Sequence, residues 1–268
     1  MSDKNNNNSQ VDSIISAISL INTALSIPVE LPVSGGTIQF RQLTTAQEKR
    51  LVKDLLTNKT STFLAAILPI LQENCENKNV SLKDLTIVDL YAIILKIRIY
   101  SIGEEITLKI PYKKPKTGSF TTKVHLMSIY DQLIKNIKKM DSMDFNIELS
   151  PYKVYCSIPK IKEILESSSE NIDTFYDTLF IETARMVTRI DIISNSGEVK
   201  PIDFQNFSIG DKIKILENIP NATLTKVYAE SVKKIKGLKD LMLFDFVFEG
   251  EKYKQNIDLM SPDFFTVF

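Results

Sequence analysis

The segment of residues 85–105 constrains the fold of this chain more than any other part of the sequence. Up to Gly103 nearly every residue in it is apolar, and a helix that is apolar on most sides must be buried on most sides. The run is too short, and too often interrupted by charge, to cross a bilayer. The charged residues that interrupt it are Asp89, Lys96 and Arg98. We therefore expect residues 86–101 to form the central buried helix of a soluble fold.

Charge and composition narrow the possible functions. In 268 residues, 33 basic side chains balance 33 acidic ones, so the total charge gives no support to a nucleic-acid-binding or membrane-surface protein. His125 is the only histidine, and Cys75 and Cys156 lie far apart. These counts leave zinc sites, disulfide frameworks and histidine-based triads without the residues they need. We expect no metal, no cofactor and a reducing cytoplasm.

The first 26 residues are expected to form a separate segment. Residues 1–10 are polar, lack the pattern of a signal peptide and are expected to be disordered. Apolar side chains then recur at helical spacing as far as residue 25. Such an amphipathic helix either packs on its own domain or docks on a partner protein, and the sequence leaves both open. In the second case the contact residues are Ile14, Ile18, Ile21 and Leu25.

Residues 27–150 are expected to form a first domain of hairpins and helices. The alternation over residues 29–40, with a turn at Gly35 and Gly36, predicts a β-hairpin. Thr44 with Gln47 three residues later is typical of a capping box at a helix start. Further predictions are a helix over 61–74, a hairpin over 106–126, a helix over 127–139, and strands over 145–149 and 153–157.

Residues 151–268 are expected to form a mostly helical domain that ends in a β-hairpin. The predicted helices cover 161–165, 171–189 with Asn171 as its cap, 208–218, and 221–236 with Gly237 ending it. The chain shows no alternation of strand, helix and parallel strand. We predict an α+β fold, with helices interleaved with small antiparallel hairpins, in two lobes that divide near residues 140–160.

The acidic residues give little support to a reaction centre. Glu104 and Glu105 are neighbours at a predicted strand, where successive side chains point to opposite faces. A metal-dependent nucleic-acid-processing or nucleotide-binding enzyme would need carboxylates that converge in space. The candidates are Glu104, Asp141, Asp144 and Asp245. This enzyme is our alternative hypothesis, and an unrelated cytosolic adaptor is a third.

Three features instead favour a protein that binds other proteins. The N-terminal amphipathic helix is the first, and the edge strands of the hairpins are the second. The third is the run of aromatic residues at the end of the sequence, which is costly to leave in water. Its candidate contact residues are Phe264, Phe265 and Phe268.

Three blocks carry a family resemblance. They are residues 31–41 followed by Gln47-Glu48-Lys49, the buried helix leading to residues 97–104, and residues 207–220 followed by a helix and a hairpin that ends in Phe264-Phe265. In this order they resemble the baseplate hub assembly proteins of T-even-type contractile-tailed bacteriophages, which are myoviruses. The resemblance covers residues 28–268.

This resemblance implies a non-catalytic protein that helps to build a phage baseplate hub or wedge. Its partners would be other baseplate or tail proteins, such as hub or tape-measure-related subunits. It would act in the host cytoplasm during assembly. Some members of the family stay in the virion as part of the tail baseplate, and others act only during assembly. Some relatives carry cysteine pairs at the turns of the two later hairpins, whereas residues 113–118 and 249–251 have none. A metal role at those turns is therefore not expected here.

Overall fold

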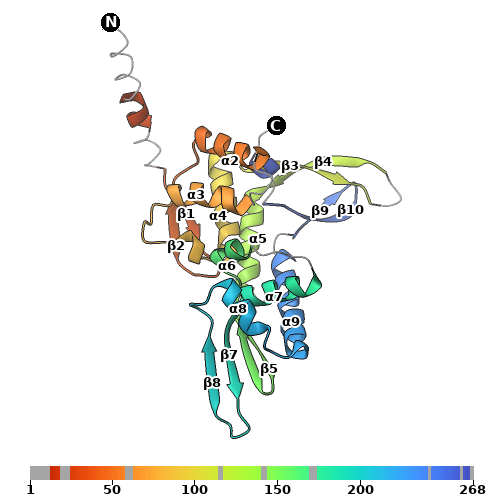
Figure 1. The fold of residues 1–268 in the computed structure, drawn as a ribbon. Coiled ribbons are helices and arrows are strands. Elements are labelled where there is room, and N and C mark those ends of the chain that lie inside the picture. The colour runs from red at the N-terminus through yellow and green to blue at the C-terminus, as the bar shows by residue number, and fades with distance from the viewer. Residues whose placement is uncertain are drawn as a thin grey trace.

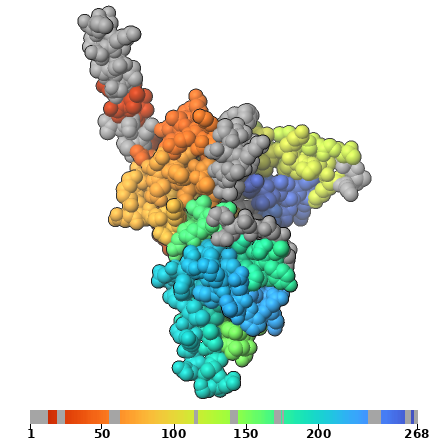
Figure 2. Space-filling view, viewed as in Figure 1, coloured from red at the N-terminus to blue at the C-terminus, as the bar shows by residue number. Residues whose placement is uncertain are grey.

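The structure is a computed structural model of residues 1–268. It describes residues 13–18, 25–57, 63–113, 117–139, 144–168, 174–240, 243–259 and 262–265. Figure 1 shows a body of two lobes, with the helical residues 13–18 at one end of the molecule and a long hairpin at the other. Figure 2 shows the same two ends standing out from the surface.

The first lobe contains two small hairpins and four longer helices. Its elements are β1 (Ile27–Glu30), β2 (Thr37–Phe40), α2 (Thr45–Thr57), α3 (Phe63–Asn74), the short 3-10 helix η1 (Leu82–Asp84), α4 (Ile87–Ser101), β3 (Glu105–Pro111), β4 (Ser119–His125) and α5 (Leu126–Lys139). The predicted capping box before α2 is confirmed. The backbone N–H of Gln47 donates to Thr44 Oγ1 at 3.3 Å, and the backbone N–H of Thr44 donates to Gln47 Oε1 at 3.0 Å.

Helix α4 is the central buried helix that the sequence predicts. Its apolar residues from Val88 to Ile97 lie in the core on several sides of the helix. Thr86 caps its first turn, since Thr86 Oγ1 accepts the backbone N–H of Asp89 at 3.2 Å. Helix α4 therefore lies at the centre of the first lobe, and other elements of this lobe pack around it (Figure 1).

The second lobe is an antiparallel sheet of four strands, in the order β5-β6-β7-β8, with helices packed against it. Its elements are β5 (Phe145–Leu149), β6 (Tyr152–Cys156), α6 (Ile161–Ser167), α7 (Phe175–Met186), β7 (Val187–Ile193), β8 (Val199–Asp203), α8 (Ile209–Leu216) and α9 (Asn221–Asp240). Helix α9 continues through Gly237, so the predicted stop there is wrong, because one glycine weakens a helix without ending it.

The predicted helix over residues 171–189 needs a second correction. Asn171 lies outside the described residues, and Thr174 caps α7 by accepting the backbone N–H of Asp177 at 3.2 Å. The helix ends at Met186, and Val187 begins strand β7. This strand is rich in branched apolar residues and pairs with β6 on one side and β8 on the other. Two ladders of strand hydrogen bonds outweigh the helical spacing of the residues before it.

The last part of the chain returns to the first lobe. It comprises β9 (Leu243–Phe248), β10 (Glu251–Asn256) and the 3-10 helix η2 (Pro262–Phe265). Apolar residues from this part lie in the same hydrophobic cluster as α4, whereas a second cluster joins the four-stranded sheet to α7, α8 and α9. A boundary between residues 150 and 151 would separate the paired strands β5 and β6. The α+β class and the interleaving of helices with small antiparallel sheets are confirmed.

Candidate partner-binding surfaces

The helix of residues 13–18 exposes its apolar side chains. Ile14 is 53% exposed and Ile18 is 52% exposed, and Leu25 just before β1 is 52% exposed. Among the described residues, the three hydrophobic clusters include none of them. Ile21 lies outside the described residues. The prediction that these side chains bind a partner stays a prediction, and the described ones are more than half exposed.

The aromatic residues near the C-terminus have a different place. Phe264 is only 1% exposed and Phe265 only 3% exposed. The Phe265 ring packs on Phe63 of α3, with 5.8 Å between ring centroids. The sequence analysis proposed these two rings as partner contacts, whereas in the structure η2 folds back and places both of them in the core of the first lobe. Phe268 lies outside the described residues.

The hairpins β3–β4 and β9–β10 cover each other with aromatic rings. Phe120 of β4 stacks on Phe248 of β9 with 3.8 Å between ring centroids, and it packs edge-on against Tyr253 of β10 at 5.0 Å. A small third cluster holds these rings together. One face of each hairpin is thus used within the chain, although Val247 on β9 points to solvent.

Two of the sheet edges are protected. Beyond β2, the backbone N–H of Glu76 donates to the carbonyl of Gln39 at 2.9 Å, so the segment after α3 covers that edge. Beside β8, the backbone N–H of Phe204 donates to the carbonyl of Thr188, and the backbone N–H of Ser194 donates to the carbonyl of Glu198. In this antiparallel register the even-numbered residues of β8 direct their backbone groups toward β7, so the backbone of Pro201 faces the open edge. Proline has no N–H to offer at that position, and it therefore blunts an edge that could pair with another chain.

One face of the four-stranded sheet carries a charged network that the sequence analysis missed. Arg189 donates to both carboxylate oxygens of Asp191, at 2.6 and 2.9 Å. The Arg189 guanidinium and the Lys153 ammonium lie 5.2 and 5.6 Å from the centroid of the Tyr155 ring. The hydrogen bond from Arg189 lowers the pKa of Asp191 below its ordinary value. The branched residues after Met186 were the available signal, since they favour a strand with two faces.

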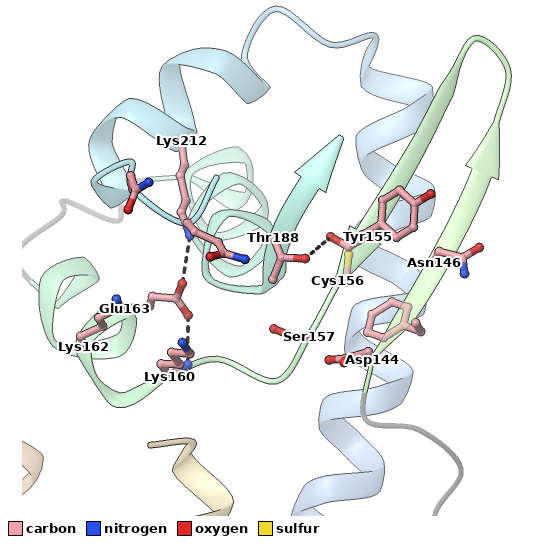
Figure 3. A pocket seen from close by; sticks show the side chains of 13 residues that line it. Asp144, Asn146, Tyr155, Cys156, Ser157, Lys160, Lys162, Glu163, Thr188 and Lys212 are labelled. Carbon is pink, nitrogen blue, oxygen red and sulfur yellow. Dashed lines mark hydrogen bonds and ion pairs between the residues drawn. The ribbon is translucent and has the colours of Figure 1, made fainter. Parts of the chain in front are cut away.

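A polar cleft of about 570 Å³ lies between this sheet, α6 and α8 (Figure 3). Lys212, which is buried, donates to Glu163 at 2.9 Å, and the other carboxylate oxygen of Glu163 accepts the backbone N–H of Lys160 at 2.9 Å. Burial raises the pKa of the Cys156 thiol in the cleft wall to about 12, so this thiol is protonated at neutral pH and is a poor nucleophile. The charges of Lys212 and Glu163 neutralise each other, and this ion pair joins α8 to α6.

The carboxylates required by the enzyme hypothesis are spread over the molecule. Glu104 precedes β3, Asp144 lies at the cleft, and Asp245 is on β9. Asp141 lies outside the described residues. Within the residues that the structure describes, no group of three or more His, Cys, Asp or Glu side chains is placed to hold a metal ion. The metal-dependent alternative gains no support.

Comparison with known proteins decides the family. A family model described as T4 bacteriophage base plate protein matches residues 25–241, which is most of the 268-residue chain. The chain belongs to this family. No curated protein and no solved structure matched it.

In this base plate protein, the match extends from just before β1 to the end of α9. It includes the central helix and the four-stranded sheet. It leaves out the exposed helix of residues 13–18, the β9–β10 hairpin and η2. The exposed residues Ile14 and Ile18 therefore lie outside the part shared with the family model, and Leu25 is its first residue.

Among the residues described by the structure, none of the helices combines the length and the apolar character needed to span a bilayer.

Proposed function

We propose that this base plate protein is a non-catalytic structural or assembly component of the baseplate hub. Its N-terminal segment would bind neighbouring tail proteins. The observation that carries this proposal is the exposure of Ile14, Ile18 and Leu25 in a chain of the base plate family. Apolar side chains presented together at helical spacing favour binding of a partner surface.

The buried C-terminal residues have a structural role in this proposal. Phe264 and Phe265 fill the core next to α3 and α4, and a partner would reach them only after η2 had left its place. We assign the partner contacts to Ile14, Ile18, Ile21 and Leu25, and Phe268 remains a candidate. Assembly would take place in the host cytoplasm, before the tail is complete.

The test compares the full chain with a chain that lacks residues 1–24. This deletion spares Ser26, whose hydroxyl donates to Gln39 and Glu76 beside the first hairpin. Both tagged chains are expressed in phage-infected cells, and co-purified tail proteins are identified by mass spectrometry. The full chain should capture baseplate proteins and the deletion should lose them while its circular dichroism and melting temperature stay close to those of the full chain.

Point variants separate the apolar contact from the mere presence of the segment. Ile14→Asp and Ile18→Asp place a charge among the exposed apolar side chains, whereas Ser16→Asp adds the same charge at a polar position of the same helix. The isoleucine variants should lose the captured proteins and the serine variant should keep them. Equal capture by all three would reject the docking segment.

The non-catalytic part of the proposal has its own measurement. The acidic side chains of the described chain form no metal-binding group, so titration with Mg²⁺ in a calorimeter should release no heat of binding. A saturable heat of Mg²⁺ binding would contradict the non-catalytic proposal and support the metal-dependent enzyme hypothesis.

A further inference from the structure

The buried ion pair in the polar cleft leaves part of its hydrogen-bonding capacity unused. Lys212 is only 3% exposed, and among the described residues its ammonium has one hydrogen-bond acceptor, Glu163 Oε1 at 2.9 Å. An ammonium carries three N–H donors, so two of them have no acceptor in this part of the chain. A buried ion pair offsets its desolvation only when its remaining donors are also satisfied. Lys212 therefore needs further acceptors, and it lines a cleft that can receive them.

The carboxylates of the cleft do not supply these acceptors. Glu163 Oε1 accepts from Lys212, and Glu163 Oε2 accepts the backbone N–H of Lys160 at 2.9 Å. Asp144 is the other carboxylate that lines the cleft, and Figure 3 shows it on the side of the sheet, across from Glu163 and Lys212. The acceptors for Lys212 must therefore come from outside these residues.

The charges at this end of the cleft favour an anion. Lys160, Lys162 and Lys212 all line the cleft, and Figure 3 shows Lys160 and Lys162 on the same side as Glu163. The Lys160 side chain is exposed, and Lys162 forms a long, exposed ion pair with Asp84 at 3.6 Å. Since Glu163 balances Lys212, the other two lysines leave positive charge beside α6.

The size and the neutral lining of the cleft favour a peptide over a single small ion. Its volume of about 570 Å³ lies within the range of ligand-binding clefts, which is about 300–1,000 Å³. The amide side chains of Asn146, Gln205 and Asn206 line it, and an amide both donates and accepts hydrogen bonds, as a peptide group does. The described lining residues include no glycine and no arginine, the residues that typically hold phosphate groups.

We propose that the polar cleft binds an acidic segment of a neighbouring tail protein. One carboxylate of that segment accepts hydrogen bonds from Lys212 and lies beside Lys160, and the backbone of the segment lies along the amide side chains. This inference rests on the proposed function in one respect, since it takes the partner to be another tail protein. The site itself is separate from the N-terminal segment.

The position of the cleft gives this binding a structural consequence. The backbone N–H of Ile161 in α6 donates to the carbonyl of Leu85 at 2.9 Å, which attaches α6 to the first lobe just before α4. Helix α8 instead packs in the hydrophobic cluster of the four-stranded sheet through Ile209 and Leu216. A carboxylate held between α6 and α8 therefore links the two lobes, and its binding should raise the melting temperature.

The first test measures the binding of a hexaglutamate peptide to the full chain by calorimetry, with hexaglutamine as the uncharged control. The wild type should bind hexaglutamate saturably and should not bind hexaglutamine. Lys160→Gln should weaken this binding about tenfold. Lys214→Gln removes the same charge from α8 at a side chain that is 77% exposed and outside the cleft, and should weaken binding less than about twofold. No saturable binding of hexaglutamate, or equal weakening by both variants, would overturn the inference.

The second test removes the buried ammonium without changing the net charge. Lys212→Met alone would leave the Glu163 carboxylate without its cation, so it is combined with Glu163→Gln. The double variant should keep its circular dichroism spectrum and lose the binding of hexaglutamate. A folded double variant that binds as tightly as the wild type would contradict the role of Lys212. Lys160→Gln changes an exposed side chain, so the first test decides the inference even if the double variant does not fold.

Inorganic phosphate distinguishes a peptide site from a simple anion site. Phosphate at the same molar concentration as hexaglutamate should not displace the peptide from the wild type. Phosphate that binds as tightly as hexaglutamate, and that the double variant no longer binds, would assign the cleft to a phosphate group and reject the acidic segment.

The deletion of residues 1–24 separates this inference from the proposed function. This deletion removes none of the residues that line the cleft, so the shortened chain should bind hexaglutamate as tightly as the full chain. If it does so and still captures tail proteins, the cleft is kept and the docking segment is rejected. If the wild type does not bind hexaglutamate but the deletion loses the tail proteins, the docking segment is kept and the cleft is rejected.

Discussion

Arg98 on the central helix donates from Nε to the backbone carbonyl of Phe264 at 2.7 Å, across 166 positions of the sequence. The same guanidinium donates from Nη1 to the carbonyl of Gly103 at 2.6 Å. One buried cation therefore holds the C-terminal turn η2 and the exit from α4 at the same time. Charge-assisted hydrogen bonds of this kind are stronger than neutral ones.

Replacement of Arg98 should destabilise the whole first lobe. In Arg98→Ala the carbonyls of Phe264 and Gly103 lose their donor inside the protein, and the loss should be about 2–3 kcal/mol. Lys49→Ala, which removes a charge from the exposed side of α2, should change stability by less than about 0.5 kcal/mol. Urea unfolding of both variants checks this. Equal stabilities would mean that η2 is held by its phenyl rings alone.

Asp89 should be the second sensitive position. Its buried carboxylate accepts hydrogen bonds from the backbone and hydroxyl of both Ser34 and Thr86, and from the backbone N–H of Val33 at 2.9 Å. It therefore joins the first hairpin to the start of α4. Asp89→Ala should cost about 2–4 kcal/mol, since several buried donors lose their acceptor.

Asp84 provides the matched control for this prediction. It lies one helical element earlier and forms an exposed ion pair with Lys162 at 3.6 Å. Asp84→Ala should cost less than about 1 kcal/mol. Similar melting temperatures for the two alanine variants would contradict the assigned role of Asp89.

Acid should weaken the second lobe through the Arg189–Asp191 pair. Because the hydrogen bond from Arg189 lowers the pKa of Asp191, the folded state binds this proton less readily than the unfolded chain. The pair therefore stabilises the fold above the ordinary aspartate pKa of about 4. This contribution is lost as the pH falls through the lowered pKa of the folded state. Melting temperatures measured below pH 5 should fall less steeply for Asp191→Asn than for the wild type.

Pro201 should keep the edge strand β8 from pairing with other chains. Pro201→Val would supply an outward N–H at the centre of the edge and a residue that favours strands. We expect this variant to fold and to aggregate faster on warming, as measured by light scattering. Pro201→Lys restores the same N–H but places a charge beside it, and it should stay close to the wild type. If Pro201→Val and the wild type aggregate at the same rate, the edge of β8 needs no protection by Pro201.

Local patterns in the sequence were sufficient for much of the fold. The apolar run of α4, the capping box at Thr44 and Gln47, and the first hairpin all depend on residues close together in the chain. Strand β7 was missed because its first residues continue the helical spacing before Met186. Its pairing with β6 and β8, which the local pattern does not contain, decided its conformation.

The candidate site divides in the same way. Sequence alone determined that the N-terminal segment has an apolar helix face, since spacing and residue type define such a face. The structure decided that Ile14 and Ile18 on this face are exposed. Only the tertiary structure decided that Phe264 and Phe265 belong to the core and that Asp89 and Arg98 have buried partners. Those outcomes depend on contacts between residues far apart in the chain. A sequence pattern shows that an aromatic ring or a charge must be satisfied, and the fold determines which residues satisfy it.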